Sequence, residues 1–304
     1  GSSAISTGLS TAKTEDGDVV ITASTAVTVA QFNLLDAATS SAIVLSGGIS
    51  DTAANLAPSG TASSGLTNST TQDGDVAITI TGTAPTVAEL NKIASLTTGA
   101  VTASISGNKT TLAGLNTASG DAITATVTDA VTVAEFNTLD GKTSVGVILT
   151  GGVSDAAAAY AATNGTATAG RTAIAAQDGD AALTVTDAAT VAQANSVATA
   201  TTGTVQFSGG ITDSADALGA DGNLTSGYNA ARADDSDVNV IINDTPTIAE
   251  LNAIAGGTTG TTTAAVSGNK ADLATLTTAS TDAVTMTVTD AVTVAEFNTL
   301  DGKT

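Results

Sequence analysis

The chain of 304 residues contains no histidine, no cysteine and no tryptophan. Without histidine and cysteine, the Ser-His-Asp and Cys-His arrangements of hydrolases are excluded, and so are zinc or copper sites with imidazole or thiolate ligands. A disulfide framework is excluded for the same reason. No apolar run approaches the roughly 20 residues that a membrane-spanning helix needs, so we expect no membrane insertion.

Aromatic and basic residues are also scarce. Aromatics make up 2% of the chain, and 8 Lys and Arg stand against 29 Asp and Glu, which gives a net charge of −21. Such an acidic chain repels the phosphates of nucleic acids, which excludes them as partners, and attracts cations. Much of the hydrophobic content is alanine and valine. A core of small side chains favours a repeat architecture, in which each unit buries its face against the next.

Internal repetition is what the chain has in abundance. The phrase T-[VI]-A-[EQ]-x-N begins at six threonines, Thr28, Thr86, Thr132, Thr190, Thr247 and Thr293. The sequence of residues 130–143 recurs letter for letter at residues 291–304. This period predicts two three-unit repeat blocks in one continuous solenoid, residues 1–161 and residues 162–304, the second truncated within its last unit. Both ends cut through units, so we expect a fragment of a longer protein.

Each unit combines a strand pattern with a signal for the start of a helix. In ALTVTD, Leu183 and Val185 alternate with threonines, as in a strand with one buried face. A threonine three residues before Glu or Gln then forms a capping box, and the apolar residues after it make one stripe of a short helix. Because Gln replaces Glu here in two units, a capping role is favoured over catalysis. The Asn that follows is expected to satisfy backbone groups of the neighbouring turn.

A second strand follows the helix, with glycine pairs such as Gly47-Gly48 that indicate a close backbone approach. Strands joined by return helices run parallel. The sequence therefore predicts an α/β solenoid, a parallel β-sheet with short return helices and a leucine-rich-repeat-like architecture. The alternative is a right-handed parallel β-helix, which has no use for six capping boxes. The Ala/Thr/Gly-rich stretches 158–176 and 218–234 are expected to be loops.

Acidic turns precede the strands in four units. Paired aspartates on a short turn supply oxygen ligands of the kind that Ca²⁺ prefers, and Ca²⁺ is the one cofactor that we expect. The candidate metal ligands are Asp16, Asp18, Asp73, Asp75, Asp178, Asp180, Asp235 and Asp237. The alternative is that these residues form only solvated turns.

The Ala/Thr/Gly/Val-rich composition and the phrases SDTAANL (residues 50–56) and TVAEFNTLD (residues 132–140) resemble a class of giant repetitive proteins. These are the extracellular and cell-surface proteins of marine bacteria and cyanobacteria, which include S-layer-like, haemolysin-like and motility-associated repeat proteins. The resemblance covers essentially the whole chain. It implies an extracellular location, a scaffold or adhesive role and Ca²⁺ binding, and it carries over no catalytic residues.

Repetition, acidity and the lack of catalytic motifs favour a non-enzymatic role. We expect a structural tandem-repeat segment of a large secreted cell-surface protein, such as a spacer, a surface-layer element or an adhesin stalk. Its expected partners are other repeats of the same parent chain, polysaccharide or neighbouring copies. One alternative is a Ca²⁺-binding adhesive or assembly module, with Tyr160 and Tyr228 as candidate sugar-stacking rings. The other is a carbohydrate-active solenoid enzyme, with carboxylates from the cluster Asp216, Asp221, Asp234 and Asp235.

Overall fold

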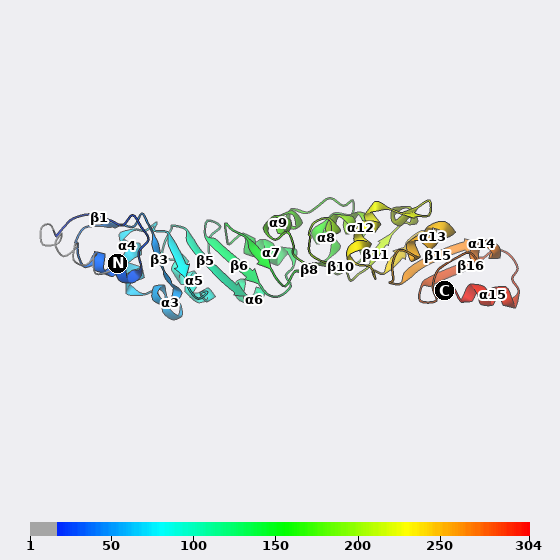
Figure 1. Cartoon of the computed structure of the whole chain (residues 1–304), viewed down its shortest axis with the longest axis horizontal. Helices are drawn as coiled ribbons and strands as arrows, with labels where there is room; N and C mark the ends of the chain where they lie inside the picture. The colour runs from blue at the N-terminus through cyan, green and yellow to red at the C-terminus, as the bar shows by residue number, and fades with distance from the viewer. Residues whose placement is uncertain (1–16) are drawn as a thin grey trace. The chain divides into compact units, whose positions relative to one another are not determined.

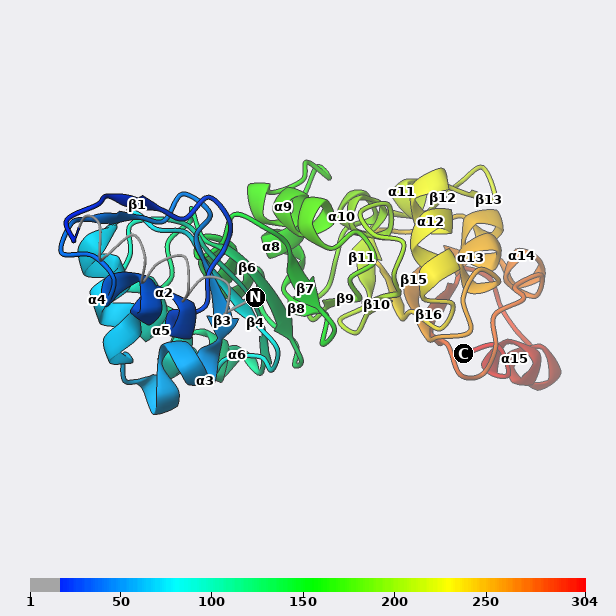
Figure 2. The ribbon, with the colours of Figure 1, turned by 60° about the vertical axis from the view of Figure 1, so that its left-hand side comes forward.

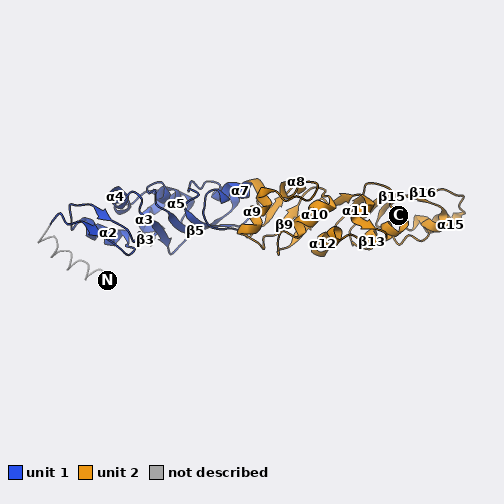
Figure 3. Cartoon of the chain, turned by 90° about the horizontal axis from the view of Figure 1, so that it is seen from above, with its two compact units in different colours: residues 1–129, 135–148 blue, residues 130–134, 149–304 orange. Residues whose placement is uncertain are grey.

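A computed structural model describes residues 17–304 of the chain. These residues form two compact units, shown in Figure 3. The first runs to residue 129 and includes residues 135–148, and the second contains residues 130–134 and 149–304. In each unit short strands alternate with short helices, and successive strands pair in parallel. The architecture is therefore α/β with parallel sheets, and the described sheets are not closed.

The first unit is built on parallel strands that follow one another in sequence order. Strand β1 (Ile21–Thr22) pairs with β2 (Ile43–Val44). The next strands form one sheet in the order β3 (Ile49–Thr52), β4 (Ile78–Thr81), β5 (Val101–Gly107), β6 (Ala122–Val127) and β7 (Val147–Leu149). Figure 1 shows β3, β5 and β6 following one another in this order. The helices between them are α2 (Val29–Asp36), α3 (Ala53–Leu56), the 3-10 turn η1 (Pro58–Gly60), α4 (Ser64–Gln72), α5 (Val87–Ala94), α6 (Lys109–Leu112) and α7 (Val133–Asp140).

The second unit repeats this plan. One sheet has the order β10 (Val205–Phe207), β9 (Leu183–Val185), β8 (Val153–Asp155). Another has the order β11 (Ile211–Asp213), β14 (Val240–Ile242), β15 (Thr262–Gly268), β16 (Ala283–Val288), and a small hairpin joins β12 (Gly219–Ala220) to β13 (Asn223–Leu224). The helices are α8 (Ala157–Tyr160), α9 (Ala169–Gln177), α10 (Val191–Ala198), α11 (Ala215–Leu218), α12 (Ser226–Asp234), α13 (Ile248–Ala255), α14 (Lys270–Leu273) and α15 (Val294–Asp301).

The strands have one apolar and one polar face, as their period-two pattern predicts. In β5, Val101, Ala103 and Ile105 are buried, while the threonine and serines between them are exposed. Helix α5 buries Leu90 and Ile93 in the same unit. The core is therefore a thin layer between sheet and helices, and the outer face of β5 is a row of hydroxyl side chains.

Capping boxes begin five of the helices, in agreement with the sequence analysis. In α2, the Thr28 hydroxyl accepts from the backbone N–H of Gln31, and the Gln31 side chain accepts from the backbone N–H of Thr28. The same reciprocal pair starts α5, α10, α13 and α15. Two backbone donors that lack a partner within each helix are thereby satisfied. Because Gln and Glu make the same contact, the interpretation of this position as a cap is confirmed in these helices.

The stretches 158–176 and 218–234 were expected to be loops, and this expectation was wrong for their second halves, although residues 161–168 are largely irregular. They contain α9 and α12, whose Ile174, Tyr228 and Ala231 are buried. Figure 2 shows α12 beside α10 and, in the first unit, α4 beside α2. The second residue of α12 is glycine because the helices approach closely: a Cβ on Gly227 would lie 2.9 Å from a methyl carbon of Val191, and a Cβ on Gly65, the second residue of α4, would lie 2.2 Å from one of Val29. A glycine in the sequence usually indicates a loop, but here it lies inside a helix and allows a neighbouring helix to pack closely against it.

The glycine pairs mark close backbone approaches, as predicted. Gly48, Gly152 and Gly210 have φ of 77°, 73° and 76°, a region that favours glycine. A Cβ on Gly48 would also lie 2.7 Å from the carbonyl oxygen of Ala77. Each pair breaks one long strand into two short ones, such as β2 and β3. Among residues 17–304, no helix combines the length and hydropathy that a membrane crossing requires.

Candidate functional site

Aspartate carboxylates connect chain segments that lie 20 to 30 residues apart, at many places within residues 17–304. Twelve aspartates each accept a hydrogen bond, of 2.5 to 3.0 Å, from a backbone N–H that lies 20 to 30 residues earlier. They are Asp51, Asp73, Asp121, Asp129, Asp155, Asp178, Asp187, Asp213, Asp235, Asp244, Asp282 and Asp290. Hydrogen bonds to an ionised carboxylate are shorter and stronger than neutral ones. Much of the negative charge of the chain therefore has a structural use.

Seven of these bonds come from the first residue of a helix. Their donors are Val29, Lys109, Val133, Ala157, Val191, Ala215 and Lys270. The first N–H groups of a helix have no partner within it, and the helix dipole favours a negative charge at that end. A single aspartate thus satisfies the start of a helix from a strand or turn that follows 20 to 30 residues later in the chain.

The acidic turns are held from both sides. The first aspartates of three turns, Asp73, Asp178 and Asp235, accept from the backbone N–H groups of Leu45, Leu149 and Phe207. The middle residue of each turn then accepts from the backbone N–H of a threonine 23 or 24 residues later, as Gly74 does from Thr98 at 2.9 Å. The glycine after that threonine, Gly99, has no room for a side chain, since a Cβ would lie 2.1 Å from the carbonyl oxygen of Asp75. The turns therefore belong to the packing between chain segments that follow one another in sequence.

The predicted metal ligands differ in their surroundings. Asp16 lies outside the described residues. The second aspartates of the turns, Asp18, Asp75, Asp180 and Asp237, are exposed, whereas the first aspartates are half-buried at Asp73 and Asp178 and buried at Asp235. Within residues 17–304, no group of three or more acidic side chains is placed to hold a metal ion. Ca²⁺ binding at these turns stays a prediction.

Two turns bring their own pair of carboxyl groups together. Burial raises the pKa of Asp178, and the neighbouring Asp180 raises it further, while the N–H of Leu149 lowers it. The pKa of Asp235 is raised in the same way by burial and by Asp237. Two oxygens of each pair could face one cation, but Ca²⁺ takes six to eight oxygen ligands. Backbone carbonyls and water would have to supply the others.

The two tyrosines cannot act as sugar-stacking rings. Tyr160 and Tyr228 are both fully buried, so neither ring offers a face to a ligand. The Tyr160 hydroxyl donates toward the carbonyl oxygens of Val153 and Thr184, at 3.0 and 3.1 Å, while the Tyr228 hydroxyl is buried without a partner. Burial raises the pKa of Tyr228 to about 12. This basis for polysaccharide binding is therefore wrong, because the rings fill the narrow core beneath α8 and α12.

The carboxylates considered for an enzyme come from different elements. Asp216 lies in the first turn of α11, Asp221 has a positive φ in the β12–β13 hairpin, and Asp234 ends α12. The fourth, Asp235, is engaged by the N–H of Phe207 at 2.6 Å. Asp235, the buried carboxylate of this cluster, is thus already engaged by a backbone N–H.

A lysine–glutamate pair beside a small cavity occurs twice, and the sequence analysis did not single it out. Lys109 lies 3.1 Å from Glu135, and Lys270 lies 3.0 Å from Glu296. The first pair borders a cavity of about 320 Å³, which Thr110, Ala113, Thr138 and Leu139 also line. The second borders a similar one of about 200 Å³. The signal that could have found the pair is the phrase S-G-N-K, which recurs 161 residues later.

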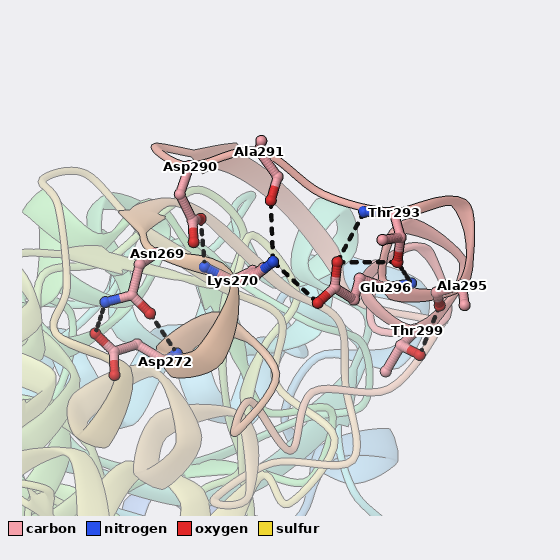
Figure 4. A network of polar contacts seen from close by, with 9 residues as sticks. All are labelled: Asn269, Lys270, Asp272, Asp290, Ala291, Thr293, Ala295, Glu296 and Thr299. Carbon is pink, nitrogen blue, oxygen red and sulfur yellow. Dashed lines mark hydrogen bonds and ion pairs between the residues drawn. The ribbon is translucent and has the colours of Figure 1, made fainter.

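The surroundings of the second pair explain its chemistry. Figure 4 shows the Glu296 carboxylate between Thr293 and Lys270. One carboxylate oxygen accepts from the backbone N–H and the hydroxyl of Thr293, and the other faces Lys270. The Thr293 N–H and then Lys270 lower the pKa of Glu296 to about 2. A glutamate held this way stays ionised near neutral pH and is a cap, whereas a general acid needs a raised pKa.

The repeated asparagine satisfies backbone groups of the neighbouring turn in two units. The Asn91 side chain donates to the carbonyl oxygen of Gly114 and accepts from the N–H of Asn116, both at 2.7 Å. Asn252 makes the same two bonds with Thr275 and Thr277. The structural interpretation is confirmed at these positions.

No protein-family model matches the chain, and no curated protein or solved structure matches it either. Its function is therefore inferred from its own residues and their contacts.

Proposed function

We propose that this chain is a structural tandem-repeat segment of a large secreted cell-surface protein, a spacer, surface-layer element or adhesin stalk. In this proposal, the parallel strands and return helices stack as an α/β solenoid with a leucine-rich-repeat-like architecture. Other repeats of the parent chain are its main partners, and it catalyses no reaction.

The observation that carries the proposal is the use of aspartate. Asp51, Asp155 and Asp213 recur at equivalent positions, and each accepts from the first N–H of the helix that begins 22 residues earlier. An active site is a single unrepeated arrangement, whereas these contacts recur along the chain. Repetition of contacts between neighbouring units is the basis of stability in solenoid proteins. The acidity that suggested metal or sugar chemistry is thereby explained by assembly of the repeat itself.

Surface labelling of the cells that make the protein tests its location. An antibody against the chain should label intact cells, and permeabilisation should add little signal. A cytosolic protein from the same cells serves as the control that is labelled only after permeabilisation. Labelling of this chain that also requires permeabilisation would contradict the cell-surface part of the proposal.

Single-molecule pulling tests the solenoid. Because the chain has no cysteine, Ser2→Cys and Thr304→Cys provide unique attachment points. Units that contact only their neighbours are expected to unfold in several steps, each releasing the length of a few strands and helices. Release of the whole chain in one step would contradict a solenoid.

A second candidate function is a Ca²⁺-dependent assembly module, which the paired carboxyl groups of Asp178 with Asp180 and Asp235 with Asp237 favour. Binding to the native state alone raises stability by mass action. Thermal unfolding in millimolar Ca²⁺ should therefore shift upward and return with a chelator. The double variant Asp180→Asn with Asp237→Asn should lose the shift, and the exposed Asp216→Asn should keep it. An unchanged midpoint in the unsubstituted protein would rule this function out.

A further inference from the structure

The C-terminal end of the second unit exposes apolar residues that the same sequence buries elsewhere. Residues 130–143 and 291–304 are identical. In the first copy Val133 and Phe136 are buried, but in the second copy Val294 is 78% exposed and Phe297 is 55% exposed. Because the sequences do not differ, the difference comes only from what lies against each copy.

Strand β16 shows the same contrast. It is the last strand of its sheet, so its outer edge has no strand beside it among the described residues. Its equivalent β6 is followed by β7. A cavity of about 210 Å³ opens here, lined by Val284, Met286, Val288, Phe297, Leu300, Asp301 and Thr304. We call the edge of β16 together with Val294 and Phe297 the open face.

The first unit shows how the equivalent surface of α2 is closed. The carbonyl oxygen of Val27 accepts from the N–H of Ser50 at 2.9 Å, and the N–H of Val29 donates to Asp51 at 3.0 Å. Helix α4 then covers Val29, with Gly65 at the closest approach. Val29 and Phe32 are buried as a result.

The second unit closes the surface of α10 in the same way. Ala189 accepts from the N–H of Thr212 at 2.9 Å, and the N–H of Val191 donates to Asp213 at 2.9 Å. Helix α12 covers Val191, and a Cβ on Gly227 would lie 2.9 Å from a methyl carbon of that valine. The N–H of Val133 likewise donates to Asp155. After α2, α7 and α10 the closing segment has the sequence G-G-[IV]-[ST]-D, at residues 47–51, 151–155 and 209–213.

The open face presents the matching groups. Val292 and Val294 occupy the positions in the repeat that Val27 and Val29 occupy in the first unit. Helix α15 is the counterpart of α2, and its apolar side chains correspond to those that α4 covers on α2. We propose that the open face binds a polypeptide segment with the chemistry of residues 144–177. That segment is a strand ending in G-G-[IV]-[ST]-D, followed by a helix whose second residue is glycine. This assignment of a recognition surface does not depend on the cell-surface location that we propose for the protein.

The proposed contacts are defined atom by atom. The [ST] N–H of the partner donates to the carbonyl oxygen of Val292, and the aspartate after it accepts from the N–H of Val294. The strand adds to the edge of β16, as in other cases of strand addition, and the glycine-containing helix lies on Val294 and Phe297. The carboxylate at a helix N-terminus and the buried phenyl ring both favour the bound state.

A labelled peptide of residues 144–177 tests the proposal directly. Fluorescence anisotropy with the full chain should show saturable 1:1 binding. Phe297→Glu should weaken binding about tenfold or more, because a charge then occupies the buried position. Asp155→Ala in the peptide should weaken it as well. The matched control Ile241→Glu changes an exposed residue of β14 away from the open face and should bind as the unsubstituted chain does.

A second measurement is needed in case the isolated peptide does not fold and therefore does not bind. A chain that carries another copy of residues 144–177 after Thr304 should protect the Val294 N–H from hydrogen exchange and unfold at a higher temperature. Absence of both peptide binding and this protection would overturn the proposal. Concentration-dependent dimers of the original chain that Phe297→Glu abolishes and the peptide does not displace would overturn it too, since a second copy would then be the occupant.

Discussion

The carboxylate of Asp51 accepts a hydrogen bond from the backbone N–H of Val29, 3.0 Å away and 22 residues earlier in the chain. The same carboxylate also accepts from the N–H of Thr52 and the side chain of Asn55. One buried side chain therefore caps α2, orders the start of the next helix, α3, and joins the two helices. This relationship recurs at Asp155 and Asp213.

Removing the Asp51 carboxylate should destabilise the first unit. In Asp51→Ala, the N–H of Val29 loses its partner in a buried position, which costs about 1 to 3 kcal/mol. Urea unfolding followed by circular dichroism should show the loss, and hydrogen exchange at Val29 should speed up. The matched variant is Asp75→Ala, whose side chain is exposed, with an expected change within about 0.5 kcal/mol. Equal effects of the two variants would contradict the role of Asp51 in joining α2 to α3.

The glycine at the second position of α4 should not tolerate a methyl group. A Cβ on Gly65 would lie 2.2 Å from Val29 and 2.9 Å from Asn33, so α2 and α4 must separate. Gly65→Ala is expected to destabilise the chain by about 1 to 3 kcal/mol, measured by the same unfolding experiment. A Cβ on Gly120 meets nothing within 4 Å, so Gly120→Ala is the control. A neutral Gly65→Ala would show that the two helices are not closely packed in solution.

The two buried tyrosines should respond differently to loss of the hydroxyl group. Tyr160→Phe removes hydrogen bonds to Val153 and Thr184 and should cost about 1 kcal/mol. Tyr228→Phe removes a buried hydroxyl without a partner, so stability should stay the same or rise. Each variant is the control for the other, and thermal unfolding measures both. A larger loss for Tyr228→Phe would mean that its hydroxyl has a partner in solution.

Stability should depend on pH through the acidic turns. Burial, and then Asp237, raise the pKa of Asp235 above its ordinary value of 3.8. Its contribution to folding is fully present below that value and is lost as pH rises through the raised pKa. Asp235→Asn keeps an oxygen acceptor for Phe207 and does not ionise, so its thermal midpoint should exceed that of the unsubstituted chain increasingly from about pH 4 upward. A gap that narrows with rising pH would contradict the raised pKa.

The sequence predicted the parts of the fold that depend on neighbouring residues. Capping boxes such as Thr28 with Gln31 are read within four residues, and the alternation in β5 within seven. The glycine pairs were informative for the same reason, since positive φ at Gly48 is a local property. Repetition then multiplied each local signal across the chain.

The sequence did not reveal where side chains would find partners. Tyr160 and Tyr228 are two of the few aromatics and were candidate sugar-stacking rings in the adhesive alternative, but they fill the core. The helix at residues 169–177 was missed because alanine, threonine and an early glycine carry little helical periodicity. Residues of this helix such as Ile174 are buried only because other segments of the chain pack against them, and the local sequence does not show those segments.

The sequence by itself determined the repeat, the alternation of strands and capped helices, and the acidity, because these are set by residue type and short-range spacing. Only the tertiary structure decided what the acidity is for. It placed twelve carboxylates against backbone N–H groups 20 to 30 residues away, and it buried Phe136 while exposing the identical Phe297. The physical reason is that hydrogen bonding and burial depend on which segments meet in space, and two identical stretches can meet different neighbours.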